Sequence, residues 1–362
     1  MKKLLKVLSI ALGLIVLALA GVAFDVARFG GMFSSVTPAF AGQCNALPLA
    51  GSAEDIRIDR QRGIAYLSFL DRASVNRGEP VNGTVMLIDL NVAEPAARPA
   101  MAYDPEGFRP HGMSLLMRPD TPMRLFAISH RPDGTHTVEI AAEAASGGLF
   151  PRETVRDAAF VHPNAIAAIG PRQFYLANDS AARTDFDRLL EVVFRRGVST
   201  LIYYDGSEAR IAATGLKFPA GLASNADTTR LYVGEVFAKT LRVYQRDLAT
   251  GALTLEETVP LDTAPDNLEV DDDGVVWIAA HPKLLTFFGH VSEPAKRAPT
   301  QVLRFDPRGP KPADGGKDPR LTQIYMNAGE QISAGTVAAP WHDEFLVGAL
   351  LDHKVLICKP NP

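Results

Sequence analysis

A short polar pattern that could carry chemistry recurs six times along this chain of 362 residues. Each copy is a dipeptide of small or polar residues, followed by an apolar strand, a turn and a second apolar strand, at intervals of roughly 50 residues. The first positions of the dipeptides are Glu54, His111, Asn164, Ala220, Asp266 and Ala334, and the second positions are Asp55, Gly112, Ala165, Gly221, Asn267 and Gly335. Such a repeat is typical of the blades of a β-propeller.

The dipeptides should converge, because the innermost strand of every propeller blade begins at one mouth of the central channel. The glycine and alanine positions would leave space around the channel axis. Carboxylate and amide oxygens would enter it from Glu54, Asn164, Asp266 and Asn267. Hard oxygen donors without a cysteine or histidine cluster suit Ca²⁺, which takes about 6–8 oxygen ligands. The alternative is that these Asp and Asn residues only form turns before strands.

Six copies predict an all-β fold, a six-bladed β-propeller over residues 44–362. A pair of β-sandwiches is the main alternative, but a sandwich requires no equivalent dipeptide in every repeat. One segment after residue 50, residues 185–194, has the spacing of apolar residues that indicates a helix. The acidic run 271–274 lacks the spacing and the closing Glu of an EF-hand loop, so we expect a hairpin turn there.

The N-terminal segment differs from the rest of the chain. Lys2, Lys3 and Lys6 precede an uncharged, Leu-rich run over residues 7–24. This pattern predicts a hydrophobic helix at residues 1–24, either a signal-anchor or a cleaved signal peptide, and a linker over residues 25–43. A helix in the protein core is the alternative. The positive end stays inside, so we expect an exported protein that is membrane-anchored, periplasmic or extracellular.

The chain has two cysteines, Cys44 and Cys358, which bracket the exported part. In an oxidising compartment this placement favours a disulfide bridge over two free thiols. Their spacing excludes a zinc site of the C-x-x-C type.

Composition excludes several classes of protein. Apolar residues make up 47% of the chain and charged residues 22%, which is ordinary for a soluble globular protein rather than a disordered chain, a coiled coil or a polytopic membrane protein. The net charge of −4 offers no basic excess to neutralise phosphates, so we expect no nucleic-acid partner. The chain also lacks the nucleophile elbow, the H-E-x-x-H zinc motif, the dinucleotide fingerprint and the P-loop.

Several local runs give the chain a resemblance to the serum paraoxonase/arylesterase family, which consists of calcium-dependent six-bladed propellers that hydrolyse lactones and aryl esters. The runs cover residues 44–45, 51–55, 110–114, 170–175, 178–179, 266–268, 281–282 and 335–338, together with Trp277. The family keeps its hydrophobic N-terminal segment as an anchor and joins its terminal cysteines. It also places a helix over the site, similar to residues 183–196 here.

The resemblance implies a catalytic calcium ion held by Glu54, Asn164, Asp266 and Asn267. Two positions depart from the family pattern. The family has an asparagine where this chain has Ala220. A second, structural calcium would use Asp55 and the main chain at Met113, but the expected aspartate is Ala165 here, which puts that ion in doubt.

The resemblance also implies a histidine pair, His111 and His130, and a further site-lining histidine, His281. A calcium ion beside the ester carbonyl would stabilise the oxyanion that forms when water attacks. His111 is the expected base for that water, because the ordinary histidine pKa of about 6.5 suits neutral pH. His130 would orient His111 or accept its proton. Asp266 is a second candidate for the base or nucleophile.

The sequence therefore predicts a calcium-dependent hydrolase of carboxylic esters and lactones. Its partners would be a small-molecule ester or lactone substrate and a membrane, through the N-terminal segment. The departures at Ala220 and Ala165 keep open a propeller that serves as a non-catalytic binding or scaffold protein. Another calcium-propeller enzyme, such as a sugar lactonase or a strictosidine-synthase-like protein, is a third reading.

Overall fold

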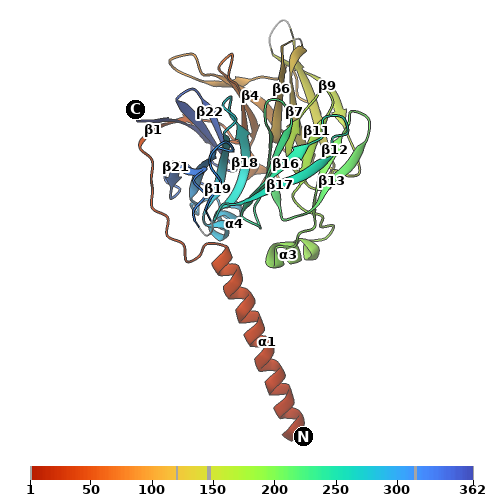
Figure 1. The fold of residues 1–362 in the computed structure, drawn as a ribbon, viewed down its shortest axis with the longest axis vertical. Helices are drawn as coiled ribbons and strands as arrows, with labels where there is room; N and C mark the ends of the chain where they lie inside the picture. The colour runs from red at the N-terminus through yellow and green to blue at the C-terminus, as the bar shows by residue number, and fades with distance from the viewer. Residues whose placement is uncertain (1, 120, 145–147, 314–315, 362) are drawn as a thin grey trace.

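The computed structural model describes residues 2–119, 121–144, 148–313 and 316–361. Within them the chain forms six four-stranded antiparallel sheets around a common axis, as the prediction of a six-bladed propeller requires (Figure 1). The first blade consists of β2 (Ser52–Asp59), β3 (Ile64–Leu70), β4 (Thr84–Asp89) and β5 (Ala97–Pro99). The second blade consists of β6 (Pro110–Arg118), β7 (Thr121–His130), β8 (His136–Glu143) and β9 (Leu149–Val155). The third blade consists of β10 (Pro163–Ala168), β11 (Phe174–Asn178), β12 (Ser199–Tyr204) and β13 (Ala209–Leu216).

Blades four and five follow the same order from the innermost to the outermost strand. They consist of β14 (Pro219–Ser224), β15 (Arg230–Glu235), β16 (Thr240–Arg246) and β17 (Leu253–Pro260), and of β18 (Ala264–Val270), β19 (Val276–His281), β20 (Thr300–Phe305) and β21 (Leu321–Asn327). The sixth blade takes its inner strands from the C-terminus and its outermost strand from the N-terminus. It consists of β22 (Gly335–Trp341), β23 (Glu344–Ala349), β24 (Lys354–Pro360) and β1 (Gly42–Pro48).

Five of the six innermost strands are irregular at the predicted dipeptides, where the pairing register shifts in β2, β6, β10, β14 and β18. The prediction for the sixth blade was displaced: the register of β22 shifts between Gly335 and Val337, so Thr336 and not Ala334 lies at the irregularity. A bulge of this kind bends the strand and re-aims its side chains. Because the innermost strands of successive blades also contact one another around the ring, the bulges place the dipeptide side chains at one end of the channel.

The glycines of the dipeptides serve close packing between blades. A Cβ atom on Gly112 would collide with the backbone oxygen of Asn164, and one on Gly221 with the backbone oxygen of Asp266. The small residues were expected to leave space around the axis. Instead they let the backbone of the next blade approach, and this contact sets the position of two predicted ligands.

Apolar side chains fill the space between blades. Ile56 and Leu67 of the first blade pack with Val337 and Leu346 of the last one in a single buried cluster. Strands buried on both faces explain why the sequence shows short, nearly continuous apolar runs. The run 271–274 forms the predicted turn between β18 and β19, with the Asp271 carboxylate accepting from the Trp277 indole at 2.9 Å.

In the part of the chain that the structure describes, four helices lie outside the sheets: α1 (Lys2–Phe29), α2 (Arg72–Asn76), α3 (Asp185–Phe194) and α4 (Leu284–Ser292). Helix α3 confirms the predicted helix. The expectation of a single helix after residue 50 was wrong, because α2 and α4 are also present. Helix α4 does carry apolar residues at helical spacing, at positions 284, 287, 288 and 291, within a run too short to distinguish from a strand.

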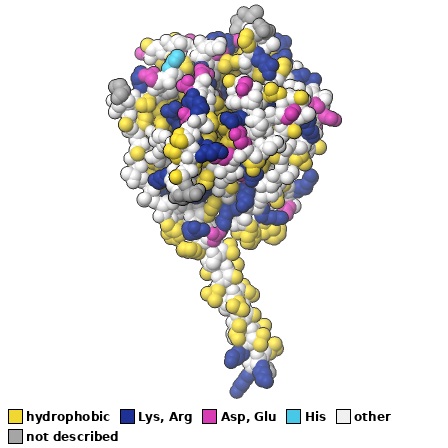
Figure 2. All heavy atoms as spheres, in the orientation of Figure 1, with side chains coloured by type: hydrophobic (Ala, Val, Ile, Leu, Met, Phe, Trp, Pro, Cys, Tyr) yellow, Lys and Arg dark blue, Asp and Glu magenta, His cyan; other side chains and the backbone are white. Residues whose placement is uncertain are grey.

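Helix α1 projects from the same end of the ring as α3 and α4 (Figure 1). It is 28 residues long, none of them buried, and it is apolar enough to cross a membrane. Figure 2 shows hydrophobic side chains along its length and lysines at its tip. The helix runs five residues beyond the predicted segment 1–24, and that division of the chain stays a prediction.

The predicted bridge between Cys44 and Cys358 is present and closes the ring. The two cysteines face each other in the pairing of β1 with β24. The bridge therefore links the two ends of the propeller across 314 residues of sequence.

We expect the double variant Cys44→Ser/Cys358→Ser to unfold at lower denaturant concentration than the parent. The loss has an upper bound on the order of 5–6 kcal/mol, because the bridge restricts a very long loop in the unfolded chain. Titration with a thiol reagent should find no thiol in the unfolded, unreduced parent. Two reactive thiols in that sample would contradict the bridge.

Candidate functional site

A cavity of about 190 Å³ lies at the mouth of the channel, under helix α4. Six residues predicted for the site line it: Glu54, His111, Asn164, Ala220, Asp266 and His281. Apolar side chains of α4, including Phe287 and Phe288, form part of its wall. The bulged inner strands thus bring the predicted oxygen donors of three blades together.

Hydrogen bonds occupy the nitrogen ends of the site amides and leave the oxygen ends free. Asn267 Nδ2 donates to Glu54 Oε1 at 2.7 Å, and Asn164 Nδ2 donates to Asp179 Oδ2 at 3.1 Å. Three buried oxygens then have no hydrogen-bond partner: Glu54 Oε2, Asn164 Oδ1 and Asn267 Oδ1. Burying such atoms is costly unless something satisfies them. A cation is the natural partner for a set that contains only acceptors.

A histidine holds the remaining carboxylate. One oxygen of Asp266 lies 2.8 Å from Nε2 of His281, and the His281 ring stacks on Phe287 of α4 with a centroid distance of 3.9 Å. His281 therefore orients Asp266 as well as lining the cavity.

The charge of Glu54 is poorly compensated by the protein alone. Burial raises the pKa of Glu54, and Asp266 raises it further, while Arg72 and the Asn267 hydrogen bond act in the opposite direction. A cation at the free oxygens would favour the charged form. Two carboxylates and two amides of this kind match the hard-oxygen preference of Ca²⁺, so the donor set fits that ion.

The residues expected for a second ion do not fit one. The Asp55 carboxylate is already occupied by N–H donors, among them the Met113 backbone N–H at 2.6 Å and the Arg57 guanidinium at 3.0 Å. Met113 thus presents a donor to Asp55, and Ala165 offers no side-chain oxygen. The implied structural calcium has no donor set at this position.

The histidine pair belongs to a longer series. The rings of His111 and His130 are 5.0 Å apart between centroids, and Nδ1 of His130 lies 2.9 Å from Nδ1 of His136. His162 follows, 5.9 Å from His136 between centroids, and its Nε2 lies 2.9 Å from the Ala182 carbonyl oxygen. The family resemblance pointed to His111 and His130, whereas His136 and His162 were missed because neither the repeat nor the resemblance marks them.

Burial and, to a smaller extent, the nearby charge of Arg72 lower the pKa of His111 to about 4. The pKa of His130 is also well below its ordinary value, through burial and the neighbouring imidazoles. This differs from the expected pKa near neutrality. Both rings are therefore neutral at physiological pH.

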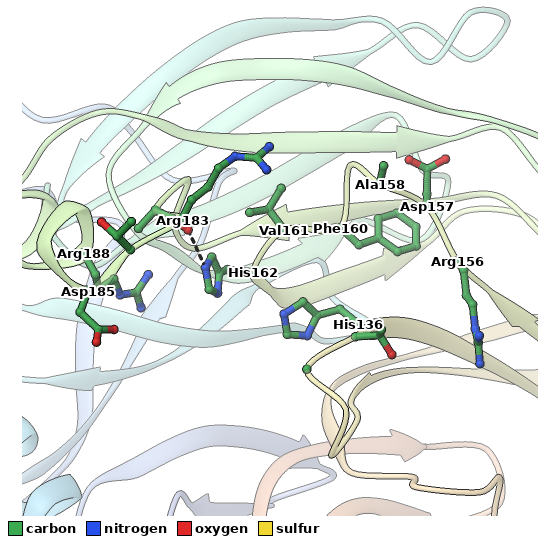
Figure 3. Close-up of a pocket in the computed structure, with 14 residues that line it drawn as sticks. His136, Arg156, Asp157, Ala158, Phe160, Val161, His162, Arg183, Asp185 and Arg188 are labelled. Atoms are coloured by element: carbon green, nitrogen blue, oxygen red, sulfur yellow. Dashed lines mark hydrogen bonds between the residues drawn. The ribbon is translucent and has the colours of Figure 1, made fainter.

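Two further hollows adjoin the histidines. One, of about 300 Å³, is lined by His130 and Arg72, and it shares His111, Val291 and Leu350 with the cavity under α4. The other is an open cleft of about 880 Å³ that contains His136 and His162 beside the start of α3 (Figure 3). The series of histidines thus leads from the buried cavity to an open surface.

Asp179 is a positioning residue that the sequence did not single out for this role. One of its oxygens accepts from Asn164, and the other accepts from Arg188 of α3 at 2.9 Å. Asp179 therefore fixes the orientation of the Asn164 amide and connects it to α3.

Comparison with known proteins agrees with this geometry. The family model described as Arylesterase matches residues 68–359. The chain belongs to the arylesterase family. It is 29% identical to "Serum paraoxonase/arylesterase 1" of Rattus norvegicus, covering 90% of this chain and 91% of that protein. It is 28% identical to "Serum paraoxonase/lactonase 3" of the same species, covering 86% of each. These relatives confirm the family resemblance seen in the sequence.

Solved structures show the same fold at greater distance. A luciferin-regenerating enzyme matches with a TM-score of 0.54 and 12% identity, covering 89% of this chain and 95% of that chain. A protein described as a gluconolactonase matches with a TM-score of 0.53 and 13% identity, covering 91% and 95%. At this identity the likeness extends to the propeller fold alone.

We expect calcium to raise the melting temperature of the protein and a chelator to lower it, because a ligand that binds only the folded state stabilises it. At saturation the shift should be roughly 5–10 °C. Asp266→Ala should abolish the calcium-dependent part of the shift. Asp273→Asn, an exposed carboxylate in the β18–β19 turn, is the matched control and should leave it intact. An unchanged melting curve on chelation of the parent would count against the site.

Proposed function

We propose that this chain hydrolyses carboxylic esters and lactones with a calcium ion held by Glu54, Asn164, Asp266 and Asn267. One observation carries the proposal: three buried oxygens at the channel mouth have no hydrogen-bond partner. Family membership supports the reaction class, since relatives in the family are described as arylesterases and a lactonase. When bound, the ion would supply a Lewis acid for the carbonyl oxygen.

His111 is placed to act as the general base. Its ring is neutral at physiological pH, so it can accept a proton from an attacking water. The imidazolium that results would be stabilised by the nearby carboxylates of Asp266 and Asp179, which both favour the charged form of His111. The depressed pKa makes His111 a weak base in the resting protein, and the carboxylates around the cavity must support the proton once it has been transferred.

His130 and His136 would serve His111 as positioning residues. The hydrogen bond between their Nδ1 atoms requires one ring to donate and the other to accept, which fixes the tautomer of His130. His136 also lines the open cleft, where protons can exchange with solvent (Figure 3). This arrangement gives the proton released by ester hydrolysis a route away from the buried cavity.

The shape of the site favours small, mostly apolar substrates. The cavity under α4 and the hollow beside His130 meet at His111, so an acyl group and an alcohol or phenol group could occupy the two sides of the base. The aromatic wall from Phe287 and Phe288 would contact the apolar part of the substrate.

Helix α1 would hold this end of the ring at a membrane surface. Its C-terminal turn is attached to the propeller: Asp25 pairs with Arg195, the residue that follows α3, and the Arg195 guanidinium lies 4.5 Å from the centre of the Phe29 ring. The Leu285 N–H of α4 donates to the Gly30 carbonyl at 3.0 Å. The same helices surround the site, so an uncleaved anchor on an exported protein would place the cavity near the bilayer.

Ala220 stands where the family has an asparagine, so the alternative of a non-catalytic binding or scaffold protein can be tested at this position. Ala220 is buried in an apolar cluster with Val236, Phe237 and Leu284. A protein that retains calcium at the site but hydrolyses neither phenyl acetate nor a γ-lactone would be a binding propeller. A sugar lactonase would hydrolyse polar lactones in preference to aryl esters, which the apolar cavity wall disfavours.

We expect His111→Gln to reduce kcat for phenyl acetate by about 10²–10⁴, because glutamine keeps a polar group of similar reach but cannot act as a base near neutral pH. Calcium affinity should be nearly unchanged. His353→Gln, at an exposed position, is the control. Full activity in both His111→Gln and Asp266→Ala would remove this site from the reaction.

Ala220→Asn tests what the missing ligand does. If the alanine weakens the calcium site, the added amide should tighten calcium binding and raise kcat. If the alanine makes room for a bulkier substrate, calcium binding should hold or improve while activity on large esters falls. Isothermal titration with calcium and kinetics on a small and a large aryl ester separate the two outcomes. Weaker calcium binding would show that this position does not face the ion.

A further inference from the structure

The Asp55 carboxylate, next to Glu54 in β2, is fully buried and fully engaged. Its Oδ1 accepts the Ile56 N–H at 2.9 Å. Its Oδ2 accepts the Met113 N–H at 2.6 Å and two N–H groups of Arg57 at 3.2 and 3.0 Å. Four donors therefore surround two oxygens, in contrast to the free Oε2 of Glu54. No unpaired acceptor is left at Asp55 for a metal ion.

The Arg57 guanidinium completes a neutral cluster in the channel. Its Nη1 donates to the Leu268 carbonyl at 2.7 Å and also pairs with Glu269. The other oxygen of Glu269 accepts from Arg60 at 2.7 Å. Two carboxylates are thus matched by two guanidinium groups. A guanidinium does not lose its proton in proteins, so Arg57 is a permanent cation that is only 5% exposed.

Neither neighbouring side chain offers an oxygen ligand to a metal ion. Ala165 is completely buried, packs with Tyr175 and Leu222 in an apolar cluster, and carries no oxygen in its side chain. Met113 directs its N–H to Asp55. An added divalent ion would find one engaged carboxylate, a methyl group and an adjacent guanidinium, which would repel it.

The structure assigns to the Arg57 guanidinium the place of the second, structural cation. The chain accordingly binds one calcium ion, at the site under α4, and its ring needs no second metal to balance Asp55. The number of one calcium ion per chain rests on the proposed function, which places that ion at the site under α4. The role of Arg57 rests only on its own contacts.

The replacement of the second ion by a guanidinium has a functional consequence, which follows from the position of Arg57 along β2. Glu54 lines the cavity under α4, whereas Arg57 lines a hollow of about 230 Å³ at the far ends of the inner strands, with Arg60 and Glu269. Asp55 lies between the two. The calcium site can therefore lose its ion while the centre of the channel keeps its cation, so inactivation by a chelator should be reversible.

The first experiment counts bound calcium by equilibrium dialysis followed by elemental analysis of the full-length protein in detergent. We expect one ion per chain in the parent and none in Glu54→Gln. Two ions in the parent, or one remaining in Glu54→Gln, would overturn the assignment. After EDTA treatment and return of calcium, activity should recover to at least nine-tenths, and irreversible loss would also contradict it.

The second experiment tests Arg57 without reference to activity. Arg57→Ala removes the buried cation, which leaves Asp55 without an ionic partner and Glu269 with Arg60 alone, so the melting temperature should fall by on the order of 5–10 °C. Calcium should then restore part of the loss and bind with one additional ion per chain, because it takes the vacated place. Arg60→Ala, in the same cluster but at its more exposed edge, is the matched control and should gain no ion.

The outcomes separate the two proposals. A parent that binds no calcium would refute the proposed calcium site, while Arg57→Ala would still test the cation role through its melting temperature. A small shift in Arg57→Ala, equal to that of Arg60→Ala, would refute the role of Arg57 and leave the site under α4 unaffected. If Arg57→Ala fails to fold, Arg57→Lys should bind no additional ion, and an extra ion there would contradict the assignment.

Discussion

Charge compensation in the channel is the constraint on which the rest of this structure depends. The inner strands bring carboxylates into a space that water reaches poorly, and a buried carboxylate needs a hydrogen-bonded or ionic partner. Asp55 has such a partner within the chain, in Arg57. Glu54 does not: one of its oxygens accepts from Asn267 and the other is free. The two adjacent residues thus meet the same requirement in different ways. Asp55 pairs with an arginine of the chain itself, whereas Glu54 needs a cation that binds from solution.

The backbone makes this arrangement possible. Bulges in the inner strands turn adjacent side chains in different directions, so that Glu54 lines the cavity while Asp55 points toward Met113. Glycine at Gly112 and Gly221 lets the next blade approach closely enough for its ligand-bearing backbone to reach the channel. The disulfide and the β1–β24 pairing then close the ring that holds all six strands in place.

The fold could be predicted from the sequence because a repeat is a local signal read several times. The dipeptide positions of the first five blades, the turn at 271–274 and the cysteine pair at the two ends followed from residue type and spacing, whereas the position in the sixth blade was displaced to Thr336. Helix α4 was missed because a run of nine mostly apolar residues favours a strand as readily as a helix. The ligand candidates could be named, but the orientation of each amide depends on distant partners such as Asp179.

Arg57 shows why the centre of the channel could not be read from the sequence. Its partners Asp55 and Glu269 are separated by more than two hundred positions in the chain, and nothing in the local pattern distinguishes an arginine that fills a channel from one that faces solvent. The missing aspartate at Ala165 is a visible change, whereas the arginine that accompanies it is informative only once the two blades are placed together. The two alanines that occupy expected ligand positions therefore have different structural consequences in this protein. At Ala165 it accompanies a replacement for the ion, and at Ala220 it adjoins an apolar wall beside oxygens that still lack a partner.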